Sequence, residues 1–340
     1  MTTEQSSPNP EKIFSAVWAY QQTRALEAAV RLELFTAIGG GKATAEEAAK
    51  RIGASERGTR ILCDFLAIHG FLLKENGAYS LPPDTAAFLD SASPTYLGGA
   101  LKFLLSPTIV GSLDNLTDVV REGGTMMAGE GTVEPDHPIW VDFARSMAPL
   151  MMIPAQFMAE LVELPENGSS KILDVAAGHG QFGIAFAKKY PSAEIVATDW
   201  PNVLKVAKEN ARAAGVDSRH QLLEGDAFTT EWGNSYQLIL ATNFFHHFDL
   251  ATCRKLMSKM HRSLNPGGRV VTLEFVPNPD RITPEATASF GMTMLGTTKN
   301  GDAYTFAEYE EAFADSGFSK SEFFPIPNSN QQVIVSHKDR

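Results

Sequence analysis

Short apolar runs alternate with amphipathic segments between Lys171 and Phe275, and this alternation constrains the fold more than any other feature of the sequence. Runs of that length are typical of buried strands, and the segments between them have helical spacing. The alternation predicts a parallel sheet with helices on both faces, whose ligand site lies beyond the carboxyl ends of the strands. The predicted strands are 172–175, 194–197, 221–223, 236–241 and 269–275, and the first two predicted helices are 183–190 and 203–214.

The first predicted strand ends in the loop DVAAGHG, which runs from Asp174 to Gly180. With Gly183 it fits the pattern G-x-G-x-x-G, a weak signal because dinucleotide-binding enzymes share it. Asp174 discriminates between cofactors, since its carboxylate would repel a pyrophosphate, whereas S-adenosylmethionine has no phosphate and carries a cationic ammonium and sulfonium. The acid therefore favours S-adenosylmethionine, and an NAD-dependent oxidoreductase is the alternative.

Acidic residues also follow the second and third predicted strands. Asp199 closes the second strand, where a carboxylate can accept hydrogen bonds from the ribose hydroxyls of either cofactor class. Asp226 follows the third strand and can accept from the adenine amino group, and Phe228 can stack on the adenine ring. Together the three strand-end acids indicate a nucleoside site more specifically than the glycines do.

Two adjacent histidines, His246 and His247, follow the fourth predicted strand. Neighbouring residues on a chain point apart, and no suitably spaced third ligand is nearby, so we predict no metal site. Methyl transfer to a hydroxyl requires removal of the hydroxyl proton, a task that suits histidine near neutral pH. We therefore expect a histidine base at this strand end; the structural alternative is a histidine that caps or packs the loop.

The first third of the chain has the pattern of a winged helix. It predicts helices over 13–37, 44–52 and 57–69, and a hairpin that joins 71–73 to 79–81 across an Asn-Gly turn. A winged helix can bind DNA, but the candidate recognition helix is apolar beyond Arg57 and Arg60 and carries Asp64. We favour packing or dimerisation for this domain, with a DNA-binding regulator as the alternative.

Composition narrows the possible partners. The net charge of −11 and the pI near 5.2, with dispersed basic residues, argue against nucleic acid. Cys63 and Cys253 lie far apart in helix-like segments, so we expect two core residues and neither a disulfide nor a thiol metal site. No stretch reaches the length of a membrane span and the N-terminus lacks a targeting pattern, so we expect a cytoplasmic protein without membrane contact and residues 1–12 as a disordered lead-in.

The segment between Ser93 and Pro165 has helical spacing and is rich in Met and Phe. Pro149 and Pro154 would interrupt and bend its last helix, and flexible Met side chains suit either ordinary core or the wall of a pocket for a flat apolar ligand. The candidate pocket residues are Phe143, Met147, Met151, Phe290 and Met294.

Several motifs together carry a family resemblance. In chain order they are LELFTAIGGG, SLPPDTAAFL, TDWPNV, EGDAF, FFHHF, LNPGGRVVTLEFV and TFAEYEEAFADSGF. With these motifs the chain resembles the metal-independent, S-adenosylmethionine-dependent small-molecule O-methyltransferases, typified by plant caffeic acid and flavonoid enzymes and by bacterial enzymes of aromatic polyketide tailoring. The resemblance covers nearly everything from about Tyr20 to Val335.

The resemblance implies an α/β fold with two parts. A Rossmann-like class I methyltransferase domain over 166–340 would follow an α-helical winged-helix dimerisation domain over 13–100, with connecting helices over 101–165 that line the substrate pocket. It also implies an intertwined homodimer, S-adenosylmethionine as cofactor with S-adenosylhomocysteine as product, no metal, and a small aromatic hydroxyl acceptor.

The family's site residues fall on identifiable positions of this chain. His246 matches the catalytic base, and Glu274 matches the acid that orients it, which would fix the tautomer and stabilise the imidazolium. The expected cofactor-binding residues are Asp174, Ala176, Gly178, Gly180, Asp199, Trp200, Asp226, Ala227, Phe228, Thr242 and Asn243.

The chain departs from the family pattern at several positions. Ala176 and Ala177 replace glycines, which is tolerable if their backbone angles stay negative. Thr242 stands where the plant enzymes carry a lysine, and His247 replaces the aspartate that follows the base. The second acid expected to support the base falls at Ala303, with Asp302 adjacent. Some family members hydroxylate or decarboxylate instead of methylating, so other chemistry with the same cofactor is a further alternative.

Overall fold

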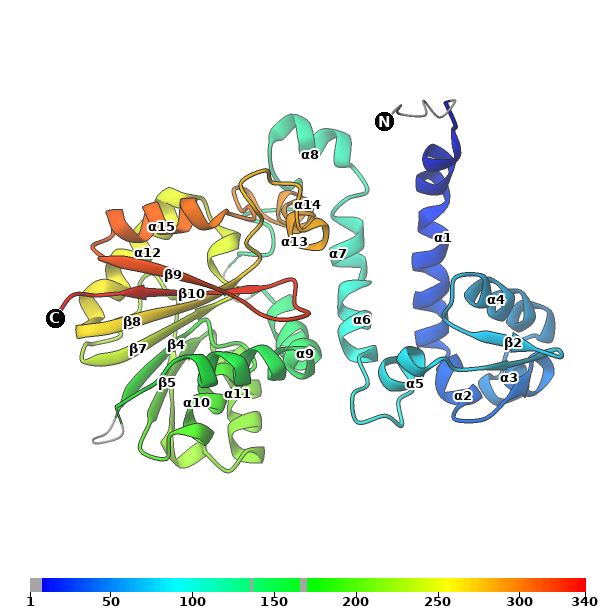
Figure 1. Ribbon diagram of the computed structural model, residues 1–340, viewed down its shortest axis with the longest axis horizontal. Coiled ribbons are helices and arrows are strands. Elements are labelled where there is room, and N and C mark those ends of the chain that lie inside the picture. The colour runs from blue at the N-terminus through cyan, green and yellow to red at the C-terminus, as the bar shows by residue number, and fades with distance from the viewer. Residues whose placement is uncertain (1–7, 135–136, 166–169) are drawn as a thin grey trace, which may run out of the picture. The chain divides into compact units, whose positions relative to one another are not determined.

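The alternating segments form the predicted sheet in the computed structural model, which describes residues 8–134, 137–165 and 170–340 (Figure 1). The chain divides into two units, Met1–Leu105 and Ser106–Arg340. The disordered lead-in predicted over 1–12 lies mostly outside the described residues, although Glu11 and Lys12 already belong to the first helix. Within the described parts of the chain, no helix is long and apolar enough to cross a membrane.

The N-terminal unit is a helical domain with a small three-stranded sheet. Thr44 caps the third helix through a complete capping box with Glu47. Asn76-Gly77 turns the hairpin, as predicted, with both residues at positive φ. The strands have the order β1-β3-β2. The elements are α1 (Glu11–Arg31), α2 (Leu34–Ile38), β1 (Ala43–Thr44), α3 (Ala45–Ile52), α4 (Glu56–Ile68), β2 (Leu73–Glu75), β3 (Ala78–Ser80), α5 (Pro83–Leu89) and α6 (Gly98–Leu104).

The single helix predicted over 13–37 is wrong, because the chain breaks between α1 and α2. Glu33 adopts a left-handed conformation with φ 55°. The break turns Leu34 and Phe35 into the core of the unit, where both are almost fully buried. Apolar residues near the start of α1, among them Val17, are exposed, and its buried residues, Ala29 and Val30, lie near its end.

The second unit is built on a seven-stranded sheet with the order β6-β5-β4-β7-β8-β10-β9. The strands β4 to β8 are parallel, and β10 is antiparallel to both of its neighbours. All five predicted strands are therefore present in one sheet, as the alternating pattern indicated. The strands are β4 (Lys171–Val175), β5 (Glu194–Asp199), β6 (His220–Glu224), β7 (Tyr236–Thr242), β8 (Leu264–Glu274), β9 (Lys320–Pro325) and β10 (Gln332–His337).

Helices cover both faces of this sheet (Figure 1). Successive residues of β4 point to opposite faces, so Ile172 joins the apolar core on one side and Leu173 joins the core on the other. Both buried cysteines, Cys63 and Cys253, are free core residues, as expected. The helices of this unit are α7 (Pro107–Gly111), α8 (Leu116–Glu122), α9 (Ile139–Leu161), α10 (Gln181–Lys189), α11 (Pro201–Ala213), α12 (Leu250–Ser263), α13 (Glu285–Ala288), α14 (Phe290–Thr297) and α15 (Phe306–Asp315), with two 3-10 turns at Asp217–Arg219 and Phe245–His247.

Two local expectations in this unit are wrong. The prolines Pro149 and Pro154 do not interrupt the helix, because α9 runs through both and buries Pro154 in the core. The fifth strand, predicted over 269–275, begins earlier, since β8 starts at Leu264, which pairs with Tyr236 before a local shift of register, and the Asn265–Gly268 segment lies inside the strand.

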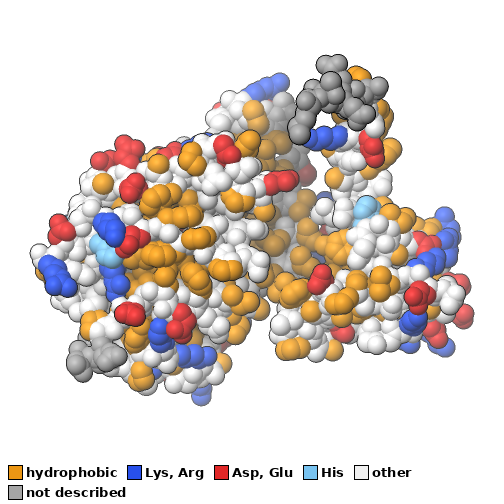
Figure 2. Space-filling model, viewed as in Figure 1, with side chains coloured by type: hydrophobic (Ala, Val, Ile, Leu, Met, Phe, Trp, Pro, Cys, Tyr) orange, Lys and Arg blue, Asp and Glu red, His pale blue; other side chains and the backbone are white. Residues whose placement is uncertain are grey.

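Acidic and basic side chains are interspersed on the face of the molecule that Figure 2 shows. This agrees with the dispersed basic residues of the sequence. It provides no clustered positive surface on that face for a polyanion.

Candidate active site

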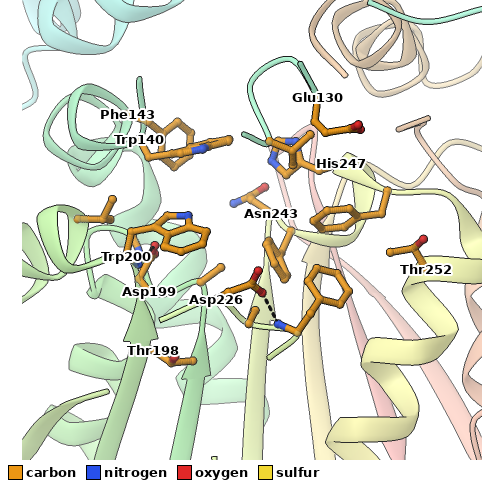
Figure 3. Close-up of a pocket in the computed structure, with 18 of the residues that line it drawn as sticks. Glu130, Trp140, Phe143, Thr198, Asp199, Trp200, Asp226, Asn243, His247 and Thr252 are labelled. Carbon is orange, nitrogen blue, oxygen red and sulfur yellow. Dashed lines mark hydrogen bonds between the residues drawn. The ribbon is translucent and has the colours of Figure 1, made fainter. Parts of the chain in front are cut away.

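A cavity of about 420 Å³ lies at the carboxyl ends of β4 to β7 (Figure 3). It is the position that the parallel sheet predicted for a ligand. Residues at four consecutive strand ends form its floor, and the start of α9 with two loops forms the opposite wall. The predicted cofactor residues that line it are Ala176, Gly178, Asp199, Trp200, Asp226, Ala227, Phe228, Thr242 and Asn243.

The loop after β4 carries the first of these residues. Gly178 and Gly180 adopt positive φ angles of 55° and 73°. Ala176 also adopts a positive φ, 51°, so the condition under which the alanine substitutions are tolerable is not met at this position. An alanine in the left-handed region costs roughly 1–2 kcal/mol relative to glycine's freedom there. The loop therefore keeps the glycine conformation although a glycine is missing.

Asp174, the residue that pointed to a cationic cofactor, is fully buried behind this loop and does not line the cavity. One carboxylate oxygen accepts from the Gly183 N–H at 3.0 Å, and the other oxygen has no hydrogen-bond partner among the described residues. Burial raises the pKa of this carboxyl to about 7. Gly180 likewise lies outside the cavity lining.

Asp199 ends β5 with its carboxylate at the cavity wall. Its two oxygens accept from the Gly178 N–H at 2.8 Å and from the Trp200 N–H at 2.7 Å. Burial raises the pKa of this carboxyl to about 6, although both amides act in the opposite direction. Each oxygen keeps a further lone pair that can accept from a ligand hydroxyl.

Asp226 and Phe228 lie on the loop that follows β6. Asp226 accepts from the Phe228 N–H at 2.6 Å, the hydrogen bond drawn as a dashed line in Figure 3. Phe228 forms an aromatic cluster with Phe244 and Phe248, with ring centres 5.1 to 6.4 Å apart, and all three rings line the cavity. This end of the cavity therefore offers aromatic faces beside an acidic hydrogen-bond acceptor.

Two segments far apart in the sequence form the wall opposite the strand ends. Gly131 pairs with Thr298 in an isolated bridge, and the Thr132 N–H donates to the Thr297 carbonyl at 3.0 Å. Trp140, at the start of α9, donates its indole N–H to the Thr132 carbonyl at 2.9 Å. The residues that this wall presents to the cavity are Glu130, Val133, Trp140, Phe143, Lys299 and Asn300.

His246 and Glu274 form a buried hydrogen-bonded pair beside the cavity. His246 Nδ1 contacts Glu274 Oε2, and both side chains are at most 5% exposed. Glu274 Oε1 accepts from the Phe244 N–H and the Phe245 N–H, each at 2.9 Å. A carboxylate has only acceptor atoms, so His246 Nδ1 is assigned as the donor in its contact with Glu274. The Nε2 lone pair of His246 is then available to a ligand.

The two histidines do not point apart as predicted, since their ring centres are 4.2 Å apart. They nevertheless face different surroundings. His247 lines the cavity and meets Trp140 edge-on at 5.1 Å, whereas His246 packs edge-on against Phe290 at 4.9 Å. Burial and the neighbouring His246 hold the pKa of His247 well below its usual value, so its imidazole is neutral. Among the described residues no group of three His, Cys, Asp or Glu side chains could hold a metal.

Asp302 does not replace the second acid beside His246. Its backbone N–H donates to the His246 carbonyl at 3.0 Å, but its carboxylate pairs with Arg281 at 3.2 Å and is 45% exposed. Ala303, at the position of the expected acid, is buried. Glu274 is thus the acid that contacts the His246 ring in the described structure.

Comparison with known proteins identifies the family. A model described as the O-methyltransferase domain matches residues 114–319, and one described as the O-methyltransferase dimerisation domain matches residues 16–91. The chain belongs to the O-methyltransferase family. The predicted resemblance, fold class and enzyme class are thereby confirmed.

Individual proteins similar to this O-methyltransferase family member are themselves named or assigned as methyltransferases. The 3-hydroxy-5-methyl-1-naphthoate 3-O-methyltransferase of Streptomyces sahachiroi is 28% identical over 92% of this chain and 91% of its own length. A crystal structure assigned as an O-methyltransferase from Nostoc punctiforme has a TM-score of 0.95 at 49% identity and covers 98% of this chain and all of its own. Human N-acetylserotonin methyltransferase, solved with S-adenosylmethionine, has the same fold, with a TM-score of 0.84 at 20% identity over the whole of both chains.

The structure brings some predicted residues of this O-methyltransferase family member together and leaves others apart. Of the candidate substrate residues, Phe143 lines the cavity, Phe290 contacts His246, and the Met151 sulfur accepts from the Asn243 amide at 3.6 Å. Met147 and Met294 do not line the cavity. The lining residues that sequence reasoning did not propose are Glu130, Val133, Trp140, Thr198, Val203, Gly225, Phe244, His247, Phe248, Asp249, Thr252, Lys299 and Asn300.

Proposed function

We propose that this chain transfers a methyl group from S-adenosylmethionine to a hydroxyl of a small aromatic acceptor, with His246 as the general base. The observation that carries this proposal is the buried His246–Glu274 pair, which stands next to a cavity lined by nucleoside-binding groups. Membership of the O-methyltransferase family supplies the reaction class.

The cavity fits the proposed cofactor in size and in chemistry. Its volume of about 420 Å³ lies within the usual range for small-molecule sites. Asp199 would accept from the ribose hydroxyls, Asp226 from the adenine amino group, and Phe228 with its aromatic neighbours would stack on the adenine. Asp174 would act on the cationic end of the cofactor through the loop that covers it or through water, since it does not reach the cavity directly.

When bound, S-adenosylmethionine supplies an electrophilic methyl group. The chain's own contribution is to hold the acceptor hydroxyl in line and to remove its proton. Glu274 keeps the Nδ1 proton of His246 in place, which leaves Nε2 as the acceptor of the hydroxyl proton, and its negative charge stabilises the imidazolium that results. No metal is needed for either step.

Aromatic surfaces around His246 support an aromatic acceptor. Phe290 stacks on Phe275 with ring centres 3.8 Å apart, and His246 lies edge-on to both rings. The Streptomyces relative, named for a hydroxynaphthoate, acts on a flat aromatic hydroxyl compound, in line with such a pocket. We keep Met147, Met151 and Met294 as candidate acceptor contacts beyond the described cavity.

The N-terminal unit supports assembly as a homodimer. It matches the family's dimerisation domain, and α1 exposes a row of apolar side chains that includes Phe14 and Trp18, whose rings stack at 5.5 Å. An exposed apolar face of this kind is typical of a protein interface. The predicted cytoplasmic location, like the absence of nucleic-acid and membrane partners, stays a prediction.

Calorimetry and mass spectrometry test the proposed function. The protein should bind S-adenosylhomocysteine more tightly than NADH. With S-adenosylmethionine and a panel of phenols, at least one acceptor should gain the mass of one methylene group. Tighter binding of NADH, or oxygen insertion or loss of carbon dioxide in place of the methylene gain, would contradict the proposal in favour of an oxidoreductase or of other chemistry with the same cofactor.

A further inference from the structure

A single lysine of α12, Lys259, holds the loop that carries Asp226 and Phe228. Its ammonium donates to the carbonyls of Ala227 at 2.9 Å, Phe228 at 3.1 Å and Thr230 at 2.6 Å. A lysine ammonium has three N–H donors, so this contact uses its full capacity. One side chain therefore binds three of the carbonyl groups between residues 227 and 230.

The position of Lys259 is fixed from a second side. Its ammonium lies over the ring of Trp232, 4.0 Å from the ring centre, and Trp232 is buried. Cation–π contacts of this kind strengthen when the cation is partly removed from water. Burial lowers the pKa of Lys259, while the nearby Glu231 and Asp226 act in the opposite direction. The lysine is thus a fixed donor and not a mobile surface side chain.

The loop also has contacts that do not involve Lys259. Inside it, the Thr230 N–H donates to the Asp226 carbonyl at 2.9 Å and the Phe228 N–H to the Asp226 carboxylate at 2.6 Å. Gly225 precedes it with φ 139°, a conformation that side chains rarely adopt. These local bonds close the turn. The Phe228 ring packs on Phe244 and Phe248, and the Gly225 N–H donates to the Asp199 carbonyl at 3.0 Å. Lys259 adds polar bonds that join three loop carbonyls to α12.

We propose that Lys259 is a positioning residue that presets the adenosine end of the cofactor cavity. It acts through loop carbonyls that bond to an ammonium outside the cavity lining, and thereby sets where Asp226 and Phe228 stand before the cofactor arrives. Preorganisation of this kind improves affinity, because a loop that is already ordered loses less conformational entropy when the cofactor binds. The inference rests on the proposed use of this cavity for S-adenosylmethionine.

Lys259→Met tests the inference, because it keeps most of the side-chain stem on Trp232 and removes the ammonium. Lys338→Met is the matched control: Lys338 also donates to two carbonyls, those of His261 and Leu264 at 2.7 and 2.8 Å, but it does not line the cavity or touch the loop. Both variants lose a lysine–carbonyl contact, so a shared loss of thermal stability is expected in both. Lys259→Arg, which keeps the charge but cannot place three donors in the same way, serves as a milder variant.

Three readouts separate positioning from a general structural role. Lys259→Met should weaken S-adenosylhomocysteine binding at least tenfold and raise the KM for S-adenosylmethionine similarly, with kcat at saturating cofactor and the KM for the acceptor within about twofold. Lys259→Arg should fall between this variant and the wild type. Hydrogen exchange of the Phe228 and Thr230 amides, measured without ligand, should accelerate in Lys259→Met only.

Unchanged cofactor affinity in a folded Lys259→Met protein would overturn the inference, as would an equal loss in Lys338→Met or a fall in kcat without a rise in the KM for the cofactor. Slow exchange of the two loop amides in Lys259→Met would overturn it as well, independently of any ligand. Failure of the proposed function would look different, because the wild-type protein itself would then bind no S-adenosylhomocysteine.

Discussion

Replacing Glu274 by Gln changes one atom of the His246 pair and should stop proton transfer without unfolding the site. The orientation of the new amide is decided by the two N–H groups of Phe244 and Phe245, which need an acceptor. Turning the amide nitrogen toward them would leave two buried donors unpaired, at about 1–3 kcal/mol each. The amide oxygen therefore faces the backbone, and the amide NH2 faces His246 Nδ1.

The consequence is a change of tautomer. A donor opposite Nδ1 makes Nδ1 the acceptor, which places the imidazole proton on Nε2, where the acceptor hydroxyl must be deprotonated. Recovering the active tautomer costs about 1–3 kcal/mol, and the imidazolium loses its adjacent negative charge. Loss of the base contribution should lower kcat by roughly 10²–10⁴-fold, or about 3–5 kcal/mol in activation free energy.

The assay is steady-state kinetics with an identified acceptor, accompanied by calorimetry with S-adenosylhomocysteine. Glu274 does not line the cavity, so cofactor affinity should stay within about twofold of the wild type. Glu322→Gln is the matched control, since Glu322 also pairs with a histidine, His337 at 2.8 Å, but on the outer hairpin. The reasoning is refuted if Glu274→Gln keeps kcat within a factor of about two, or if Glu322→Gln lowers it as much.

Three further predictions concern the cofactor loop, the strand-end acid and the N-terminal unit. Burial raises the pKa of Asp199 to about 6, so its carboxylate is largely charged only above that pH. Since ribose hydroxyls bind the charged form, affinity for S-adenosylhomocysteine should fall about tenfold between about pH 7 and pH 5, and binding near pH 6 should release a proton in calorimetry. An affinity that does not change with pH would contradict this prediction. Ala176→Gly removes the Cβ from a residue in the left-handed conformation, which should raise the free energy of unfolding by about 0.5–1 kcal/mol and Tm by roughly 2 °C. A lower Tm would show that the loop is not strained at this residue. Trp18→Glu places a charge on the exposed face of α1 and should weaken dimerisation at least tenfold by light scattering. Lys205→Glu, at an exposed position of α11, should not weaken it, and an unchanged dimer in Trp18→Glu would remove α1 from the interface.

The sequence predicted the parallel sheet and the residues at its strand ends well, because both depend on local pattern. An apolar run followed by an acid needs no knowledge of distant contacts, and Asp199 and Asp226 line the cavity. The His246–Glu274 pair, 28 residues apart, was predicted from the family resemblance. In the structure β7 and β8 are parallel neighbours, so the strand ends that carry the two residues meet.

Features that depend on tertiary contacts were not predictable in the same way. The cavity wall from Glu130 and Lys299 exists because a bridge joins segments far apart in the chain, and neither segment has a local motif. The hairpin of β9 and β10 was not predicted either, although its strands complete the sheet. The break after α1 follows from the burial of Leu34 and Phe35, which propensity alone does not indicate.

The burial of Asp174 shows a limit of reasoning from charge. The acid was expected beside the cofactor, but the structure places it behind the loop with one oxygen bonded to the Gly183 N–H. Its position is equally suited to shaping the loop, because a Cβ at Gly183 would press against the same carboxylate. An acidic residue at a strand end can either contact the cofactor or shape the loop beside the cofactor, and the sequence pattern alone does not distinguish the two roles.

The most direct test of the proposed chemistry is turnover by His246→Ala. His246 does not line the cavity, so the variant should bind S-adenosylhomocysteine with wild-type affinity. With an acceptor that the wild-type enzyme methylates, kcat should fall by roughly 10²–10⁴-fold at neutral pH. Undiminished turnover by a folded His246→Ala protein would contradict the assignment of the base.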